Sequence, residues 1–190
     1  MRQVYGLVLL GVGVASMGCA TPRGGSVAEK RAYVQTMKEN TLQDLYARKP
    51  ESRAKIEQSA GYGVFSNIGF HVVFVGAGNG YGVAVDRSTG KETYMRMMSG
   101  TAGLGLGAKD FRAVIVFNDK AALDEFIRKG WEFGAEGEAS ARVSDKGGTV
   151  SKAGSISNPI EIYQFTETGI SLQATLGGAR FWWDDKLNEN

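Results

Sequence analysis

Few side chains in this 190-residue chain are of types that could catalyse a reaction. The only histidine, His71, lies in an apolar run between Phe70 and Val72, so we expect it to have a structural role. Nucleophilic catalysis needs a base oriented beside the nucleophile, and no Gly-x-Ser-x-Gly motif occurs. Glu136 and Glu138 would share a strand face and could form an acid–base pair, but exposed carboxylates on an edge strand explain them equally well. We therefore predict that the protein is not an enzyme.

Nucleotide and metal sites are not expected either. The segment Gly103-x-Gly105-x-x-Ala108 resembles half of a dinucleotide-binding motif, which has to open a helix so that the pyrophosphate meets the helix N-terminus. Here it leads instead into the run 112–117, Arg-Ala-Val-Ile-Val-Phe, which is typical of a strand. With one histidine and one cysteine, any metal site would need oxygen ligands alone, and no calcium-loop spacing is present. The sequence predicts no cofactor.

Cys19 follows an N-terminal segment of the kind that directs export. Arg2 supplies a positive charge, residues 4–17 are apolar, and small residues flank the cysteine. The apolar run is shorter than the roughly 20 residues that a membrane-spanning helix needs. The segment 1–18 resembles a bacterial lipoprotein signal, which implies that Cys19 becomes the first residue and is acylated with palmitate-type chains. Cleavage after Ala20, with a soluble product, is the alternative.

The resemblance to a lipoprotein signal also implies a location. Ala20 is not the aspartate that suggests retention at the inner membrane, so we expect the periplasmic face of the outer membrane. Residues 19–26 would then form a lipidated tether, which we expect to be flexible because residues 21–26 contain one proline and a Gly-Gly pair. One domain over 27–190 would follow.

The charged residues suggest a membrane surface rather than nucleic acid as a partner. The formal net charge is +2, which does not support a nucleic-acid footprint over the whole protein. Basic residues nevertheless concentrate in the first two predicted helices, where they could bind anionic phospholipids. These candidates are Lys30, Arg31, Lys38, Arg48, Lys49, Arg53 and Lys55. Five acidic residues in the same span oppose them, so a solvated helix surface covering the core is the alternative.

Aromatic residues at the ends of elements are the other lipid-binding candidates. Trp182 and Trp183 close the last predicted strand, and Trp131 and Phe133 follow the central helix. Large amphipathic rings at such positions can lie at a membrane interface, whereas packing in the core is the alternative. Because adjacent strand residues point to opposite faces, at most one of Trp182 and Trp183 can be buried in the same layer.

The elements that position these candidates are predicted to be three helices and a largely antiparallel sheet. Apolar residues at steps of three to five predict a helix over 27–47, and Pro50 separates it from a second helix over 51–60 that Gly61 would cap. A third helix runs to Lys129 behind Asn118 or Asp119 as its N-cap, and Gly130 ends it. The predicted strands are 64–75, 81–86, 92–98, 104–117 and a weak one at 135–143, with a final hairpin that pairs 160–165 with 170–183. This is an α+β fold with a curled, barrel-like sheet.

Alternate glycines are the most distinctive feature of the predicted sheet. Gly76, Gly78, Gly80 and Gly82 recur at the period of a strand, so one face of that strand is bare backbone. A second ladder covers 103–107. Each glycine weakens an isolated strand by about 0.5–1 kcal/mol relative to alanine, so we expect another layer, a helix or a ligand to pack closely against the bare faces.

In combination, the order of these blocks resembles a SYLF domain over about residues 30 to 188. The blocks are Gly61-Tyr-Gly-Val-Phe65, GAGNGYG, SGTAGLGLGAKDFRAVIVF, DKAALDEFIRKGWEFGAE and IYQFTETGISLQATLGGARF. The resemblance implies a glycine-rich, barrel-like sheet that binds membrane phospholipids. Eukaryotic members bind phosphoinositide-containing membranes and in some cases actin filaments, while bacterial relatives are commonly exported lipoproteins. We do not expect actin as a partner in a bacterial envelope.

Two other functions remain open. The chain could be a structural or protein-interaction module of the envelope, with a protein partner and no lipid recognition beyond its anchor. The alternating strands would also suit a small outer-membrane barrel, although the charged helix over 119–129 argues against that architecture.

Overall fold

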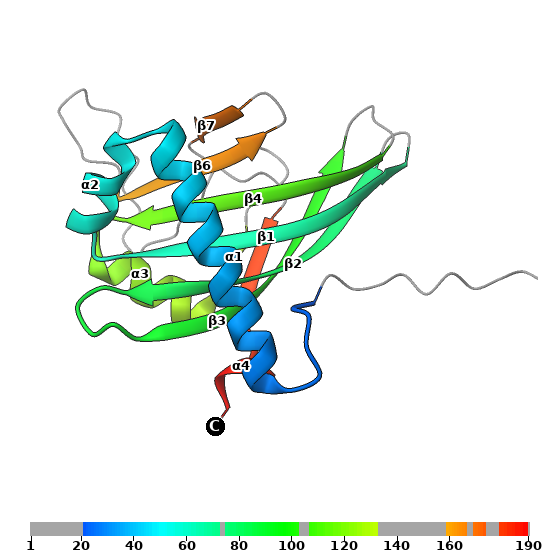
Figure 1. Ribbon diagram of the computed structural model, residues 1–190, viewed down its shortest axis with the longest axis horizontal. Helices are drawn as coiled ribbons and strands as arrows, with labels where there is room; N and C mark the ends of the chain where they lie inside the picture. The colour runs from blue at the N-terminus through cyan, green and yellow to red at the C-terminus, as the bar shows by residue number, and fades with distance from the viewer. Residues whose placement is uncertain are drawn as a thin grey trace, which may run out of the picture.

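The computed structural model describes residues 21–72, 75–102, 107–132, 159–166, 169–173 and 179–189 (Figure 1). The helices are α1 (Val27–Arg48), α2 (Glu51–Gln58), α3 (Lys120–Lys129) and α4 (Asp185–Asn188). The strands are β1 (Gly61–Val72), β2 (Val75–Asp86), β3 (Glu92–Ala102), β4 (Gly107–Phe117), β5 (Trp131–Glu132), β6 (Ile160–Thr166), β7 (Gly169–Gln173) and β8 (Ala179–Trp183). The predicted α+β class is confirmed, and α4 is an element that the sequence did not predict.

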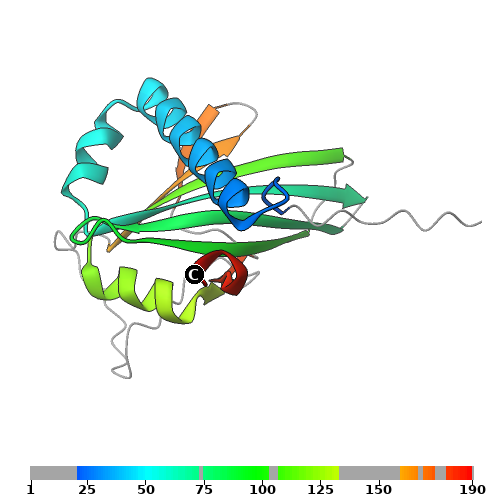
Figure 2. The same ribbon diagram turned by 60° about the horizontal axis from the view of Figure 1, so that its bottom comes forward.

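All eight strands join one antiparallel sheet in the order β5-β8-β3-β2-β1-β4-β6-β7. The sheet is curled, as predicted, and the described strands leave it open, with β5 and β7 at its edges (Figures 1 and 2). The final hairpin is confirmed in its first half, because β6 pairs with β7, whereas the prediction of one strand over 170–183 is wrong. The hairpin partner of β6 is β7, and β8 pairs with β3 and β5, where its Phe181 lies opposite Met97 in the core.

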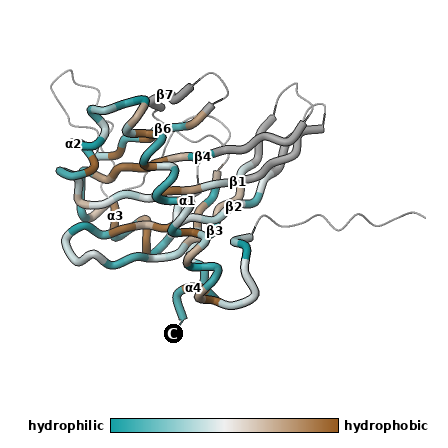
Figure 3. Tube along the Cα trace, viewed as in Figure 1, coloured by the Kyte–Doolittle hydropathy of each residue, from teal (hydrophilic) through white to brown (hydrophobic). Residues whose placement is uncertain are grey.

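Helices cover both faces of the sheet. In Figure 2, α1 and α2 lie over one face and α3 lies over the other, and we call these the α1 face and the α3 face. On the α3 face, Phe65, Phe117 and Phe181 pack against Phe126 of α3. Figure 3 shows hydrophobic residues gathered in the part of the sheet that the helices cover. Burying each large apolar side chain there contributes about 1.5–3 kcal/mol, which makes this part of the sheet a rigid support.

The first glycine ladder lies in β2, as predicted, and its close packing has an identifiable partner. Phe65 of β1 is directly opposite Gly82, and its ring occupies the space that a side chain at 82 would need. A Cβ at that position would lie 2.3 Å from Phe65 Cδ1 and 2.3 Å from the Val64 carbonyl oxygen. The neighbour at Gly82 is therefore a ring from the same sheet rather than a separate layer. Residues 103–106 of the second ladder lie outside the described residues.

The described part of the predicted tether, residues 21–26, is mostly exposed and leads into α1. Pro22 is buried, and Ser26 caps α1 in a capping box with Glu29. The backbone N–H groups of Ser26 and Gly25 donate to the Glu29 carboxylate and lower its pKa, because they stabilise the charged form. Reciprocal capping fixes the direction in which the chain enters α1.

The predicted ends of the other helices are confirmed for α3 and wrong for the end of α2. Asp119 caps α3 by accepting from the Ala121 N–H, and Gly130 ends that helix with a φ of 68°, as predicted. The prediction that Gly61 caps α2 is wrong, because Gly61 already begins β1. Ser59 ends α2 instead, and its hydroxyl donates to the carbonyl groups of Ile56 and Gly61.

Candidate functional site

A row of polar and aromatic residues crosses six strands on the α1 face. The register aligns one residue of each strand with its neighbours, and we call this set the polar row. From β8 to β6 it consists of Trp182, Arg96, Tyr81, Ser66, Arg112 and Phe165. Within the polar row, Tyr81 and Phe165 still pack against the apolar clusters of this face, whereas Arg96 is exposed.

The next row toward α2 is apolar and buried. It consists of Tyr94, Val83, Val64, Val114 and Tyr163. Val34 and Leu45 of α1 belong to the apolar clusters that cover it. The row after that has a carboxylate at each end, Glu92 in β3 and Glu161 in β6. The α1 face thus has three successive rows: the polar row, an apolar row, and a row with a carboxylate at each end.

These two carboxylates bind two of the predicted lipid-binding lysines. Lys38 of α1 pairs with Glu92 at 2.5 Å, and Lys55 of α2 pairs with Glu161 at 2.6 Å. The Lys38 side chain is only 13% exposed. The hydrogen bond to Glu161 raises the pKa of Lys55, because it stabilises the ammonium form. Lys38 and Lys55 therefore join the helices to the sheet, and their predicted contact with lipid stays a prediction.

Arg31 also has a structural role. Its Nε donates to the Leu187 carbonyl at 2.8 Å and its Nη2 donates to the Glu189 carbonyl at 2.9 Å, so it holds the segment around α4 against α1. Its guanidinium also lies 5.7 Å from the centre of the Tyr94 ring. Two donors of Arg31 are thus used within the protein, and its predicted contact with lipid stays a prediction.

The Lys38–Glu92 pair gives a testable stability difference. Lys38→Met is expected to lower the free energy of unfolding by about 2 kcal/mol, because it leaves a partly buried Glu92 without its cation. Lys129→Met is the matched control. The Lys129 side chain is 65% exposed and its pair with Glu125 spans one helical turn, so its loss should be within about 0.5 kcal/mol. Urea unfolding measures both, and equal losses would contradict the assigned role of Lys38.

The remaining predicted cations do not form one patch with Lys30. Arg48, Lys49 and Arg53 lie at the α1–α2 corner, about 27 Å along α1 from Lys30. Arg53 is exposed and its guanidinium lies 4.3 Å from the centre of the Tyr46 ring. None of the described helices is long and apolar enough to cross a membrane. The predicted basic surface is thus divided between internal bonds and two distant ends of α1.

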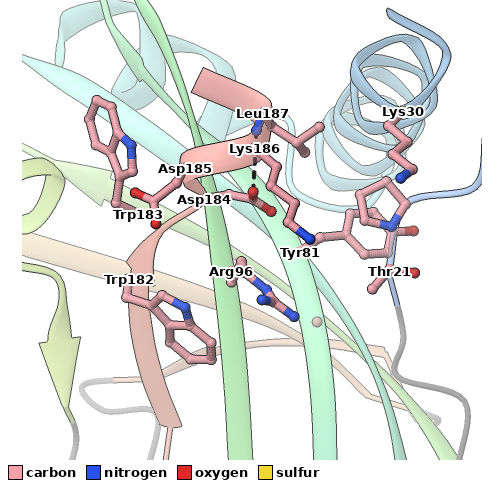
Figure 4. Close-up of a pocket in the computed structure, with 12 residues that line it drawn as sticks. Thr21, Lys30, Tyr81, Arg96, Trp182, Trp183, Asp184, Asp185, Lys186 and Leu187 are labelled. Atoms are coloured by element: carbon pink, nitrogen blue, oxygen red, sulfur yellow. Dashed lines mark hydrogen bonds between the residues drawn. The ribbon is translucent and has the colours of Figure 1, made fainter. Parts of the chain in front are cut away.

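Lys30 lines a hollow near both ends of the described chain, which we call the terminal hollow (Figure 4). It has a volume of about 290 Å³ and is bordered by the start of α1, by β2, β3 and β8, and by α4. Arg96 and Lys186 contribute two further cations, and Trp182 and Trp183 contribute two aromatic rings. Arg96 extends over the Trp182 ring, 5.8 Å from its centre. Of the predicted site residues, the structure therefore brings Lys30, Trp182 and Trp183 together.

The charges in the terminal hollow are only partly compensated. Asp184 and Asp185 also line it. Asp184 accepts from the Leu187 N–H and so caps α4, whereas Asp185 is exposed. Within the described residues, Lys30, Arg96 and Lys186 make no ion pair. The hollow thus has three unpaired cations and two carboxylates.

The two tryptophans lie as the strand period predicts. Trp182 belongs to the polar row on the α1 face, whereas Trp183 is opposite Met95, which lies in the core of the other face. Trp182 is half-buried and Trp183 is 38% exposed. The suggestion of an interfacial ring is wrong for Trp131, because that ring packs on Phe117 and Phe126. Phe133 lies outside the described residues.

Sequence reasoning missed Arg96, Lys186 and Tyr81. The predicted strands 81–86 and 92–98 form a hairpin, and counting back along it places Tyr81 beside Arg96, so part of the terminal hollow was accessible from the sequence. Lys186 was not, because the four-residue α4 has too few residues for a periodic pattern.

Several predictions concern residues that the structure does not describe. Cys19, Glu136 and Glu138 lie outside the described residues, and so does the side chain of His71, although its backbone is part of β1. The half motif at Gly103 continues into strand β4 rather than a helix, as predicted. Among the described residues, no cluster of three or more histidine, cysteine, aspartate or glutamate side chains is suited to a metal ion.

Comparison with known proteins identifies a relative. No protein-family model matches the chain. Over 166 residues the chain is 34% identical to Beta cell expansion factor A of Aeromonas veronii. The match covers 85% of this chain and 60% of that protein, so the chain spans well under two thirds of the relative's length. Over the matched region, the chain is a homologue of Beta cell expansion factor A.

Proposed function

We propose that this chain is a non-catalytic, SYLF-type lipoprotein domain that binds anionic phospholipid membranes. The assignment is supported by the order of the glycine-rich blocks, by the open, curled α+β sheet and by the homology over most of the chain. We further propose that Cys19 is acylated after removal of residues 1–18 and holds the domain at the periplasmic face of the outer membrane.

The terminal hollow is the observation that carries this proposal. Thr21 lines the hollow and follows Cys19 by two residues, so the chain allows at most about 7 Å between their Cα atoms. An acyl chain on Cys19 would therefore bring Lys30, Arg96 and Lys186 to the bilayer surface. The anchor and the cations would then contact the same membrane.

Exposed apolar side chains lie on three of the elements that border the terminal hollow. Among the described residues, three large apolar side chains are exposed, namely Val27, Met98 and Trp183. Val27 begins α1, Trp183 lines the terminal hollow, and Met98 is two residues beyond Arg96 on the same strand face. Apolar residues mixed with cations suit the interfacial region of a bilayer, where rings and methionines enter the headgroup layer.

The electrostatic contribution is modest, which is why the proposal includes an anchor. Each cation near an anionic surface contributes about 1 kcal/mol, and Asp184 and Asp185 oppose part of the sum from Lys30, Arg96 and Lys186. An acyl chain supplies about 0.8 kcal/mol per buried CH₂ group, and stable attachment takes two such signals. We therefore expect the domain alone to bind anionic membranes weakly and reversibly.

Vesicle sedimentation tests the electrostatic part. A chain that begins at Thr21 is expected to sediment with phosphatidylglycerol vesicles at low salt, and not with phosphatidylcholine vesicles. The double variant Arg96→Ala/Lys186→Ala removes two cations at about 1 kcal/mol each and should weaken binding about 30-fold. Arg128→Ala/Lys129→Ala on α3 changes the charge equally and should bind as the parent does. Equal sedimentation with both lipids, or equal losses in both variants, would contradict the proposal.

A structural or protein-interaction module of the envelope is the second candidate. It is favoured by the internal use of Arg31, Lys38 and Lys55 and by the two carboxylates in the terminal hollow. In that case the chain beginning at Thr21 would ignore both kinds of vesicle and would bind an envelope protein.

A further inference from the structure

A second hollow lies between α1 and the polar row, on the other side of Tyr81 from the terminal hollow. It has a volume of about 320 Å³, and we call it the helix–sheet hollow. Its floor is formed by Tyr81, Ser66 and Arg112, which are neighbours on β2, β1 and β4. Tyr33 and Asn40, two turns apart on one face of α1, line it from above. Its size is at the lower end for small-molecule sites, so it would hold a ligand of about one sugar ring.

The helix–sheet hollow is cationic. Arg23 and Arg112 line it, and no carboxylate does. Asp44 approaches Arg112 Nη1 at 3.7 Å, but both side chains are close to half exposed and the contact is long for a charge-assisted hydrogen bond. Within the described part of the chain, the Arg23 guanidinium has no hydrogen-bonding or ionic partner. Two guanidinium groups with free donors, facing one small space, are suited to a carboxylate or a phosphate.

The rest of the lining is neutral, and all of it except Met37 carries hydrogen-bonding groups. The side chains of Tyr33, Asn40, Ser66 and Tyr81 all carry groups that can donate or accept. Burial raises the pKa of Tyr81, and its hydrogen bond with Tyr33 acts in the same direction, so the Tyr81 hydroxyl stays protonated at neutral pH. The Asn40 amide bonds to none of the described residues. An inorganic anion would leave most of these neutral groups without a ligand partner, whereas a ligand with several hydroxyls would use them.

We propose that the helix–sheet hollow binds a monosaccharide that carries one anionic group, either a carboxylate or a phosphate. Arg23 and Arg112 pair with the anionic group. Asn40, Ser66 and the tyrosine hydroxyls bind the hydroxyls of the sugar, and the half-exposed Tyr33 ring covers one face of it. The hollow is separate from the terminal hollow, so this inference does not rest on membrane binding.

Calorimetric titration of the full-length protein in detergent tests the inference. The probes are glucuronate, glucose 6-phosphate, glucose and inorganic phosphate, and the two acids distinguish a carboxylate from a phosphate. We expect a Kd below about 1 mM for at least one acid and binding at least about 10-fold weaker for both glucose and phosphate. Glucose that binds as tightly as the acids would overturn the role of the arginines. Inorganic phosphate that binds as tightly as the acids would overturn the role of the sugar hydroxyls and leave only an anion site. If neither acid binds, the whole proposal is wrong.

Substitutions locate the binding. Arg112→Gln is expected to weaken binding of the preferred acid at least about 10-fold, because it removes one guanidinium. Arg128→Gln on the exposed surface of α3 is the control and should bind normally. Should Arg112→Gln prove unfolded by circular dichroism, Arg23→Gln makes the equivalent change in the exposed N-terminal segment. Unchanged affinity in a folded Arg112→Gln or Arg23→Gln protein would overturn the assignment.

Discussion

Gly82→Ala is expected to destabilise the protein by at least about 3 kcal/mol, because the added methyl group has no space. Its Cβ would lie 2.3 Å from the Phe65 ring and 2.3 Å from the Val64 carbonyl oxygen. The ring cannot easily move away, since it is fully buried with its centre 4.6 Å from that of Phe181. Strand β2 cannot move either, because β1 on one side and β3 on the other pair with it along nearly its whole length.

Gly25→Ala is the matched control for Gly82. A Cβ at position 25 would meet only the Glu29 carboxylate at 3.5 Å, which is an ordinary contact, so the change should stay within about 0.5 kcal/mol. Urea unfolding compares the two proteins. If the Gly82→Ala and Gly25→Ala proteins are equally stable, the explanation that glycine at 82 makes room for the Phe65 ring is wrong.

Gly130→Ala should be similarly damaging, for two separable reasons. The residue has a φ of 68° and a ψ of −176°, a backbone region occupied essentially by glycine, which costs about 1–3 kcal/mol for alanine. In addition, its Cβ would lie 2.1 Å from the Phe181 carbonyl oxygen and 3.2 Å from the Trp182 Cα atom. We expect a total loss of at least about 3 kcal/mol, because the backbone of β8 would have to shift. That shift would also move Trp182 within the terminal hollow.

Gly90→Ala separates the two contributions. Gly90 has a nearly identical φ of 70°, but a Cβ there would meet nothing within 4 Å. Its loss should therefore be the backbone cost alone, about 1–2 kcal/mol. Thermal or urea unfolding of both variants gives the difference. Equal losses would show that the approach of Gly130 to β8 carries no energetic weight.

Much of the fold could be predicted because local patterns determine it. Apolar spacing predicted α1 and α3 to within two residues at each end, and the glycine period correctly predicted a strand over 76–82. The errors concern long-range pairing. The sequence from Ile160 to Trp183 has a turn and two apolar runs, which suggested one hairpin, yet β8 pairs with β3. Strand pairing across the sheet depends on packing partners such as Met97 and Phe181, which no local pattern identifies.

The candidate site was less predictable for a related reason. A sequence does not distinguish a lysine or arginine that faces solvent from one that holds two elements together. Lys38 and Lys55 are bound because Glu92 and Glu161 lie at the ends of one row, and that row exists only once β3, β2, β1, β4 and β6 are in register. Lys30 and Trp182, by contrast, line the same hollow. The residues that hold this region together are the buried Pro22 and Arg31, which donates hydrogen bonds to the segment around α4.

The immersion depth of Met98 tests the central claim, that the end of the domain near Thr21 contacts the bilayer. Met98 is 45% exposed and lies two residues beyond Arg96 on the same strand face. A chain beginning at Thr21 lacks Cys19, the only cysteine, so Met98→Cys can carry a single nitroxide label. On phosphatidylglycerol vesicles, spin-label accessibility should show this label entering the bilayer, while a label at Arg128→Cys on α3 stays in water. A Met98 label as accessible to water as the α3 label, on vesicles that the protein binds, would contradict the account.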